Sequence, residues 1–241
     1  MKKIVEVLSN KSVLIERSLE IIIEKILNII EEKGKCTIVL SGGSTPKPLY
    51  EEISRQKILW DKLYIFWGDE RYVKADHPDS NQKMAREAWL NQVNIPSENI
   101  YAMPTSAENP NYDAQFYQEQ LENFFNLKKG EFPIFDILLL GMGDDGHTAS
   151  LFPYTDALKV NTSLVTVGEK NGEPRLTLTV PVINNAQNVM FIVAGSNKQA
   201  ALKEIFATSS NNDAYPARLI QPQGELWWLL DDQAGEQIKS K

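Results

Sequence analysis

The feature that most constrains this chain is a repeated order of apolar runs, polar glycine-containing turns and helical patterns. The run CTIVL at 36–40 leads into SGGSTP and then into a helical pattern. The order returns in KLYIFWGDERYV at 62–73, FDILLLG at 135–141 and NVMFIVAG at 188–195, and the first and last of these are followed by the helical patterns SNQKMAREAWL and SNKQAALKEIF. Strands that alternate with helices predict an α/β fold with a mostly parallel sheet and helices on both faces.

The size and charge of the chain narrow its organisation and its partners. A chain of 241 residues without an internal repeat or linker predicts a single domain, residues 1–241, with one large core. The net charge of -7 argues against broad binding to nucleic acid or to an anionic membrane, because both need a basic surface. The most apolar early segment, IIIEKILNII at 21–30, is too short to span a bilayer and carries charged residues. We therefore expect a small-molecule ligand, held by a few local cations if it is anionic.

Cysteine and histidine are scarce, which limits metal and redox chemistry. Cys36 is the one cysteine, and His77 and His147 are the two histidines. This composition excludes an internal disulfide, a thiolate zinc site and a histidine-rich metal site. Residues 1–10 lack the long apolar stretch and small-residue cleavage site of a signal peptide. We expect a cytoplasmic protein in which Cys36 is buried and His77 is a loop or capping residue.

Local signals also predict where several elements begin and end. Apolar residues at helical spacing predict a helix over 11–33, ended by Gly34. Ser80 is the expected cap of the SNQKMAREAWL helix, and a polar helix is expected near 111–127. The alternating segments SLVTVG and LTLTV bracket EKNGEPR, which is typical of a hairpin.

Four polar turns follow the predicted strands. They are SGGSTP at 41–46, GDER at 68–71, GMGDDGH at 141–147 and GSNK at 195–198. In open α/β sheets, ligands bind in the crevice beyond the carboxyl ends of the strands. We expect these turns to converge there into one site.

The SGGSTP turn has the chemistry of an anion cradle. Gly42 and Gly43 offer backbone N–H groups without side-chain shielding, Ser44 and Thr45 add hydroxyls, and a helix with Pro46 near its first position follows. The alternative is a tight turn in which the Ser or Thr only caps that helix.

Three basic residues are candidates for binding an anion. Arg71 ends a strand beside Asp69 and Glu70, which could orient its guanidinium for a bidentate contact with phosphate or carboxylate. Lys198 lies at a probable helix start, where a point cation and free amides could share one phosphate. Arg175 opens the segment RLTLTV, and its facing cannot be determined from sequence. A salt-bridged surface turn and a solvated lysine are the alternatives for Arg71 and Lys198.

The turn GMGDDGH satisfies G-x-G-x-x-G through Gly141, Gly143 and Gly146, the spacing of a dinucleotide-binding loop. Asp144 and Asp145, however, put carboxylates where a pyrophosphate would lie. Pro153 allows only about two turns of the helix that should follow. The spacing therefore does not predict a nucleotide cofactor.

A histidine just past a strand end, with acids beside it, fits a general base better. An imidazole with an ordinary pKa of about 6.5 is mostly neutral at pH 7. Asp145 or Asp144 could set the tautomer and orientation of His147. We predict that His147 is catalytic and that Asp145 supports it; a structural histidine is the alternative.

These motifs together resemble a known family. SGGSTPKPLY, WGDERYV, SNQKMAREA, FDILLLGMGDDGHTASLFP, PRLTLTVPVINNA, AGSNK and ELWWLLDDQAG occur in one order, and from about residue 36 to residue 234 the chain resembles the 6-phosphogluconolactonase family. The resemblance implies hydrolysis of 6-phosphogluconolactone to 6-phosphogluconate, the second step of the oxidative pentose phosphate pathway, without metal or redox cofactor. It also implies a three-layer α/β/α sandwich with a Rossmann-like parallel sheet.

The resemblance assigns roles residue by residue. The family's catalytic histidine falls on His147 and its phosphate and transition-state arginine on Arg71, with further substrate contacts at Gly43, Arg175 and Lys198. Which cation binds phosphate and which stabilises the oxyanion stays open, as does the choice between a monomer and a weak homo-oligomer. Glucosamine-6-phosphate deaminases share the fold and a similar glycine turn, and a non-catalytic sugar-phosphate-binding protein is a further alternative.

Overall fold

The computed structural model describes residues 2–238 and is built on a seven-stranded sheet in which every neighbouring pair is parallel. In sheet order the strands are β1 (Lys2–Leu8), β10 (Glu225–Asp231), β9 (Asn188–Val193), β6 (Ile137–Leu140), β2 (Cys36–Leu40), β3 (Leu63–Trp67) and β5 (Ile100–Tyr101). From β2 the chain continues through β3 to β5 on one side, and from β6 through β9 to β10 on the other. The predicted mostly parallel sheet is confirmed.

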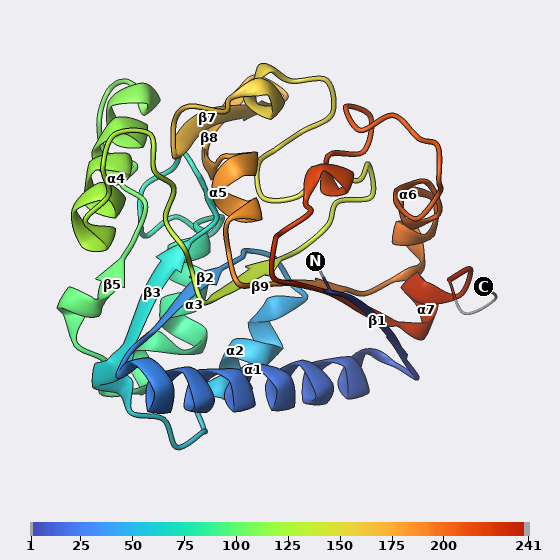
Figure 1. Ribbon diagram of the computed structural model, residues 1–241, viewed down its shortest axis with the longest axis horizontal. Helices are drawn as coiled ribbons and strands as arrows, with labels where there is room; N and C mark the ends of the chain where they lie inside the picture. The colour runs from blue at the N-terminus through green and yellow to red at the C-terminus, as the bar shows by residue number, and fades with distance from the viewer. Residues whose placement is uncertain (1, 239–241) are drawn as a thin grey trace.

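Helices cover both faces of this sheet, so the predicted three layers are also confirmed. The helices are α1 (Lys11–Lys33), α2 (Pro46–Ile53), α3 (Asn81–Ala88), α4 (Pro110–Phe125), α5 (Val180–Asn184), α6 (Gln199–Ile205) and α7 (Asp232–Gly235). Figure 1 shows α1, α2 and α3 beneath the sheet and α4 and α5 above it. Among the described residues, no helix combines the length and the apolar character needed to cross a membrane.

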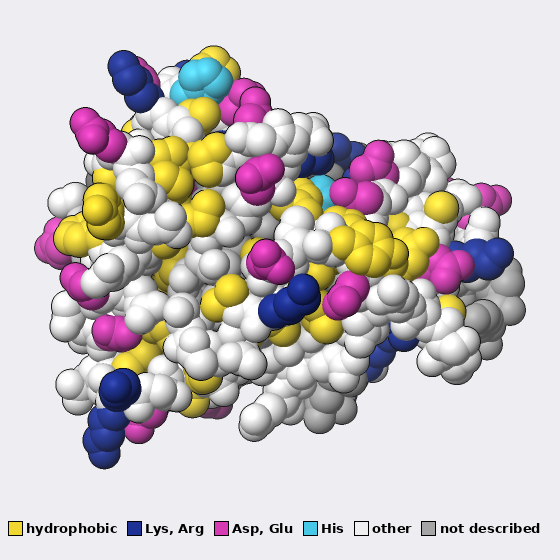
Figure 2. All heavy atoms as spheres, turned by 90° about the horizontal axis from the view of Figure 1, so that it is seen from above, with side chains coloured by type: hydrophobic (Ala, Val, Ile, Leu, Met, Phe, Trp, Pro, Cys, Tyr) yellow, Lys and Arg dark blue, Asp and Glu magenta, His cyan; other side chains and the backbone are white. Residues whose placement is uncertain are grey.

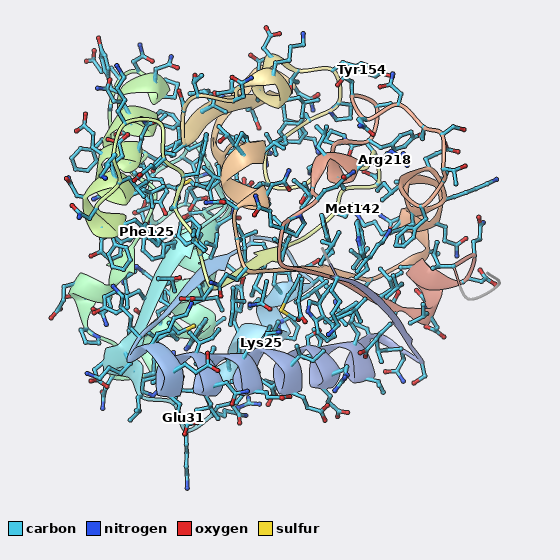
Figure 3. All side chains as sticks on the ribbon, viewed as in Figure 1. Lys25, Glu31, Phe125, Met142, Tyr154 and Arg218 are labelled. Carbon is cyan, nitrogen blue, oxygen red and sulfur yellow. The ribbon has the colours of Figure 1, made fainter. Side chains whose placement is uncertain are left out.

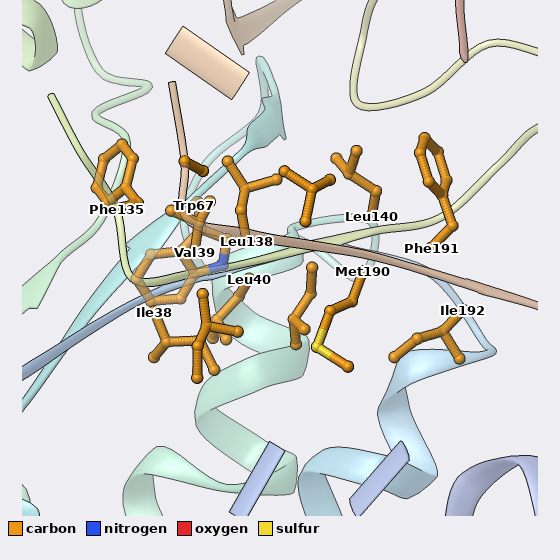
Figure 4. Packing of buried hydrophobic residues seen from close by; sticks show 14 of the residues in the cluster. Ile38, Val39, Leu40, Trp67, Phe135, Leu138, Leu140, Met190, Phe191 and Ile192 are labelled. Carbon is orange, nitrogen blue, oxygen red and sulfur yellow. The ribbon is translucent and has the colours of Figure 1, made fainter. Parts of the chain in front are cut away.

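The central strands are apolar runs because both of their faces are covered. Every residue of β2, β6 and β9 is buried. Successive side chains alternate between the faces, so Met190 and Ile192 point to one side of β9 and Phe191 to the other (Figure 4). Phe191 stacks on Trp228 of β10 with ring centroids 3.9 Å apart. Cys36 is buried as predicted, and burial raises the pKa of its thiol.

Helix ends follow the predicted signals closely. Asn10 accepts a hydrogen bond from the Val13 N–H at the start of α1, and Gly34 ends the helix with a left-handed φ of 75°. The Ser80 hydroxyl accepts from the N–H of Lys83 and caps α3 as expected. The helix predicted near 111–127 is α4, which begins one residue and ends two residues earlier than predicted.

A second, antiparallel sheet lies above the first and consists of β4 (Asp69–Arg71), β8 (Glu173–Leu178) and β7 (Val165–Lys170). The predicted hairpin is β7–β8, but its turn is shorter than the expected EKNGEPR, because Lys170 already pairs with Glu173. Only Asn171 and Gly172 form the turn, with φ of 55° and 82°, the left-handed pair that tight hairpins favour. This sheet places residue 175 opposite residue 71.

Candidate active site

A cavity of about 440 Å³ opens at the carboxyl end of the main sheet, where the loops after β2, β3, β6 and β9 meet. The loops after β2 and β6 face each other where the strand order reverses, the usual binding crevice of such sheets. In Figure 2, Lys or Arg atoms, a histidine and acidic side chains gather around one recess of the surface. The cavity brings together these predicted site residues: Gly42, Gly43, Ser44, Thr45, Arg71, His147, Arg175 and Lys198.

His147 is held by Asp145, the acid two residues before it. The imidazole Nδ1 lies 2.5 Å from Asp145 Oδ1, and the same oxygen accepts from the His147 backbone N–H at 3.0 Å. Partial burial opposes ionisation of Asp145, but the hydrogen bonds from His147 outweigh it and lower the pKa of this carboxyl to about 2. An ionised carboxylate only accepts, so Nδ1 carries the hydrogen and Nε2 keeps its lone pair. In the neutral ring, Nε2 is then the nitrogen available to accept a proton, and His147 lines the cavity.

The glycines of this turn serve the histidine and not a nucleotide. A Cβ on Gly143 would lie 2.1 Å from His147 Nδ1 and 2.5 Å from Asp145 Oδ1. Gly146 has a φ of 79° and packs against Tyr215. The segment between Gly146 and Pro153 contains turns and a short bridge between Thr148 and Leu151, and it forms no α-helix. A dinucleotide-binding loop needs a helix at this point, so the turn shares only the glycine spacing of such loops.

The turn at 141–147 is held by hydrogen bonds within itself and to a segment distant in sequence. The Gly143 N–H donates to the His147 carbonyl at 2.8 Å, and the Ala217 N–H donates to the Gly146 carbonyl at 3.0 Å. The Tyr154 N–H donates to Asp213 at 3.0 Å. Figure 3 shows Met142 just above the sheet, with Arg218 and Tyr154 further up on these two segments. The backbone of this turn is thus hydrogen-bonded to a distant segment of the chain.

The 41–46 loop is shaped as an anion cradle. A Cβ on Gly42 would lie 1.8 Å from Asn81 Oδ1, so only glycine lets the loop approach α3. Gly43 has a φ of 107°, which turns the backbone toward the cavity. α2 begins at Pro46, and Thr45 makes no side-chain capping bond to it. The alternative of a merely capping Ser or Thr is therefore not supported at Thr45.

The carboxylates beside Arg71 do not orient its guanidinium, which corrects our expectation. Glu70 turns the other way and accepts from the backbone N–H groups of Asn81 and Gln82, both at 2.7 Å, at the start of α3. Asp69 accepts from the Ser150 hydroxyl at 2.7 Å. Adjacent strand residues face opposite sides, so Glu70 points away from the cavity that Arg71 lines. Asp69 lines the same cavity as Arg71, but its carboxylate is engaged by Ser150 and makes no ion pair with the guanidinium. Burial raises the pKa of Glu70, although three backbone N–H bonds oppose it.

Arg71 instead lies opposite Arg175 across the second sheet. The guanidinium of Arg71 donates to the Asp79 carbonyl at 2.7 Å. The Nε atoms of both arginines are buried and have no hydrogen-bond partner among the described residues. Burial and the positive charge of Arg71 lower the pKa of Arg175. Two guanidinium groups on facing strand positions repel each other, and an anion between or beside them would relieve this repulsion.

Lys198 lines the cavity from the loop after β9. Its own N–H donates to the Gly195 carbonyl at 3.1 Å, and the Gly195 N–H donates to Asp231. These two amides are therefore not available to an anion, and the expectation that Lys198 and free amides share one phosphate stays a prediction for its side chain and the other amides of the segment. His77 lies in the exposed loop before α3, where its Nδ1 accepts from the Asp79 N–H at 3.2 Å.

Sequence reasoning missed two residues of the site, Lys170 and Phe152. Lys170 lines the cavity from the end of β7, and the buried Phe152 ring lies 4.6 Å from the His147 ring. The signal for both was present but weak: Lys170 flanks the Asn-Gly turn, and Phe152 is in the segment that follows the catalytic turn.

Comparisons with known proteins agree with this geometry. The model of the family "Glucosamine-6-phosphate isomerases/6-phosphogluconolactonase" matches residues 9–228. A 6-phosphogluconolactonase from Synechocystis sp. is 60% identical over 235 residues, 98% of each chain. The solved structure of 6-phosphogluconolactonase from Trypanosoma brucei has a TM-score of 0.88 and 32% identity, and covers 98% of this chain and 99% of that one. A monomeric glucosamine-6-phosphate deaminase has a TM-score of 0.81 at 17% identity over 98% of this chain and 99% of that one, which is a likeness of fold alone.

Proposed function

The chain belongs to the glucosamine-6-phosphate isomerase/6-phosphogluconolactonase family, and we propose that it hydrolyses 6-phospho-D-glucono-1,5-lactone to 6-phospho-D-gluconate, with His147 as the base. The observation that carries this proposal is the His147–Asp145 pair, in which Asp145 engages Nδ1 and His147 lines a cavity with several cations. The high identity to a 6-phosphogluconolactonase over almost the whole chain supports the lactone as substrate.

The proposed reaction begins with a water molecule between His147 and the lactone carbonyl. Nε2 takes a proton from this water as its oxygen bonds to C1, and the carbonyl electrons move onto oxygen to form a tetrahedral oxyanion. The oxyanion then re-forms the carbonyl and the bond from C1 to the ring oxygen breaks. The imidazolium returns its proton to the ring oxygen, which becomes the C5 hydroxyl. Asp145 stabilises the imidazolium through the short Nδ1 hydrogen bond in both steps.

Phosphate binding is proposed for the opposite part of the cavity. The 41–46 loop at the start of α2 offers backbone amides, and Arg71, Arg175 and Lys198 offer positive charge. Residues 2–238 contain no group of three His, Cys, Asp or Glu side chains arranged to hold a metal ion. We propose that the substrate is held by protein groups alone.

The test is the disappearance of lactone generated in situ from glucose 6-phosphate, with spontaneous hydrolysis subtracted. Acceleration by the wild-type chain supports the proposal. A rate equal to background, followed by ammonia release from glucosamine 6-phosphate, would replace it with a deaminase. Binding of 6-phosphogluconate without either activity would leave a non-catalytic sugar-phosphate-binding protein.

We further propose that residues 1–241 fold as one domain that works in the cytoplasm as a monomer or weak homo-oligomer. The single core that continues from β1 to β5 supports one cooperative unit. Light scattering after size-exclusion chromatography over a concentration series measures the assembly, and a single thermal transition is expected. A stable large oligomer, or two separate transitions, would contradict this proposal.

A further inference from the structure

Four cations line the cavity, together with the carboxylates of Asp69 and Asp144. Its lining includes Arg71, Lys170, Arg175 and Lys198, and none of these takes part in an ion pair found between residues of the described chain. A phosphate ester carries about 1.5 to 2 negative charges at neutral pH. Two of the four cations therefore suffice for the phosphate, and the other two can meet negative charge elsewhere on the ligand or on the cavity's own carboxylates.

Lys170 is the cation on the histidine side of the cavity. Its Nζ lies over the Phe152 ring, 5.5 Å from the centroid, and the same ring lies 4.6 Å from the His147 ring. Phe152 is buried, and its ring lies beside both the ammonium and the imidazole, so the cation is on the same side of the cavity as His147. The charge of Lys170 also contributes to lowering the pKa of Asp145. Arg175 lies over this ring as well, at 5.6 Å, but its partner across the sheet is Arg71.

We propose that the Lys170 ammonium contacts the C1 oxygens of the ligand, stabilising the oxyanion of the transition state and then the carboxylate of the product. This inference rests on the proposed function. Hydrolysis adds water across the bond from C1 to the ring oxygen, and the new carboxylic acid loses a proton at neutral pH. The ligand therefore gains one negative charge at C1, beside His147. A cation there stabilises the transition state and product more than the neutral lactone carbonyl.

The test compares two ligands that differ only at C1. 6-Phosphogluconate has a carboxylate there and glucitol 6-phosphate has a neutral CH₂OH group, while the phosphate and the chain length are the same. Binding of each is measured by titration calorimetry for wild type, Lys170→Ala, Lys170→Arg and Lys159→Ala. Lys159 is an exposed residue of the 3₁₀ segment Asp156–Lys159 that does not line the cavity, so it controls for loss of a charge.

Lys170→Ala should weaken 6-phosphogluconate roughly 10-fold and leave glucitol 6-phosphate within about 2-fold, because only the first ligand loses a charge-assisted contact. In the lactone assay it should lower kcat by a similar factor and change KM little. Lys170→Arg should restore most of both losses, and Lys159→Ala should match wild type. Retained glucitol 6-phosphate binding shows that Lys170→Ala is folded.

Equal weakening of both ligands would place Lys170 at the phosphate and overturn the inference, as would unchanged binding of both. Failure of the proposed function has a different signature, because the wild-type chain would then not accelerate lactone loss. If wild type accelerates the reaction but Lys170→Ala leaves the ratio of the two ligand affinities unchanged, only the role of Lys170 is refuted.

Discussion

The two walls of the cavity differ in how far their polar groups are satisfied without a ligand. On the histidine wall, Asp145 accepts from both the ring and the backbone N–H of His147, and neighbouring carbonyls and amides of the turn are paired. On the cation wall, Arg71 and Arg175 face each other with buried, unpartnered Nε atoms in the described chain. The His147–Asp145 pair is already formed in the free protein, whereas we infer that the two arginines gain hydrogen-bond partners when an anion binds.

The two walls therefore contribute differently to the free energy of binding and of the transition state. A histidine already oriented by hydrogen bonds needs no rearrangement when charge develops in the transition state. Two arginines held opposite each other repel, and the repulsion is relieved on binding a dianion. We infer that the histidine wall governs kcat and that the cation wall governs substrate affinity.

The largest effect should come from His147→Ala, which removes the proposed base from the histidine wall. We expect kcat to fall about 10²- to 10⁴-fold, the usual contribution of a positioned base, with little change in KM. Steady-state kinetics measure both parameters, and binding of 6-phosphogluconate checks that the cavity is intact. A variant with nearly full kcat would remove His147 from the mechanism.

Asp145→Asn should have the next largest effect. An amide can donate to Nδ1, which shifts the hydrogen to Nε2 and removes the free lone pair, and we expect kcat to fall on the order of 10²-fold. Substrate affinity should change little, because Asp145 is not part of the cation wall. A loss confined to KM would contradict the division between the two walls.

The pKa of Asp145 adds a prediction about the same variant. This pKa is lowered from its ordinary 3.8 to about 2, so the carboxylate contributes stability that is present above about pH 4 and is lost as the pH falls toward 2. The difference in the free energy of unfolding between wild type and Asp145→Asn should be constant above pH 5 and shrink between pH 4 and 2. Denaturant melts over this pH range measure it, and a difference that grows on acidification would refute the assignment.

Arg71→Ala should affect the cation wall and leave the other wall unchanged. Losing a charge-assisted contact costs on the order of 1.5 to 3 kcal/mol, so KM should rise roughly 10- to 100-fold. Without ligand, the melting temperature should stay the same or rise, because the repulsion of Arg175 is removed. Arg71→Lys keeps the charge but loses the bidentate geometry, so its KM should lie between those of wild type and Arg71→Ala. An unchanged KM in Arg71→Ala would show that phosphate binds elsewhere.

The sequence predicted the wall built from neighbours in the chain far better than the wall built from distant segments. The alternation of strands and helices indicated the parallel sheet, and the spacing of two residues put Asp145 within reach of His147. The cation wall depends on β8 pairing with β4, about 100 residues earlier in the chain, and no local pattern encodes that register. The facing of Arg175 and the role of Lys170 were therefore out of reach.

The error about Asp69 and Glu70 has the same origin. Adjacency in sequence suggested that these acids hold the Arg71 guanidinium, but Glu70 faces the other side of the strand and the Asp69 carboxylate is engaged by another loop. Glu70 is directed to the start of α3 and Asp69 to Ser150, two contacts that depend on tertiary packing. Short-range rules found the helix ends at Gly34 and Ser80 because the hydrogen bonds there span only three or four residues.

The smallest effect should come from Gly34→Ala, which lies on neither wall and sharpens the comparison by acting on stability alone. Gly34 ends α1 with a φ of 75°, and a Cβ there would meet no atom within 4 Å. The cost is therefore only that of a left-handed alanine, about 1 kcal/mol in the free energy of unfolding. Gly34→Asn should cost less, because asparagine tolerates this conformation. Both variants should keep wild-type kcat and KM in the lactone assay, and a change in either parameter would mean that the walls depend on the global stability of the fold, so that losses in the other variants must be corrected for it.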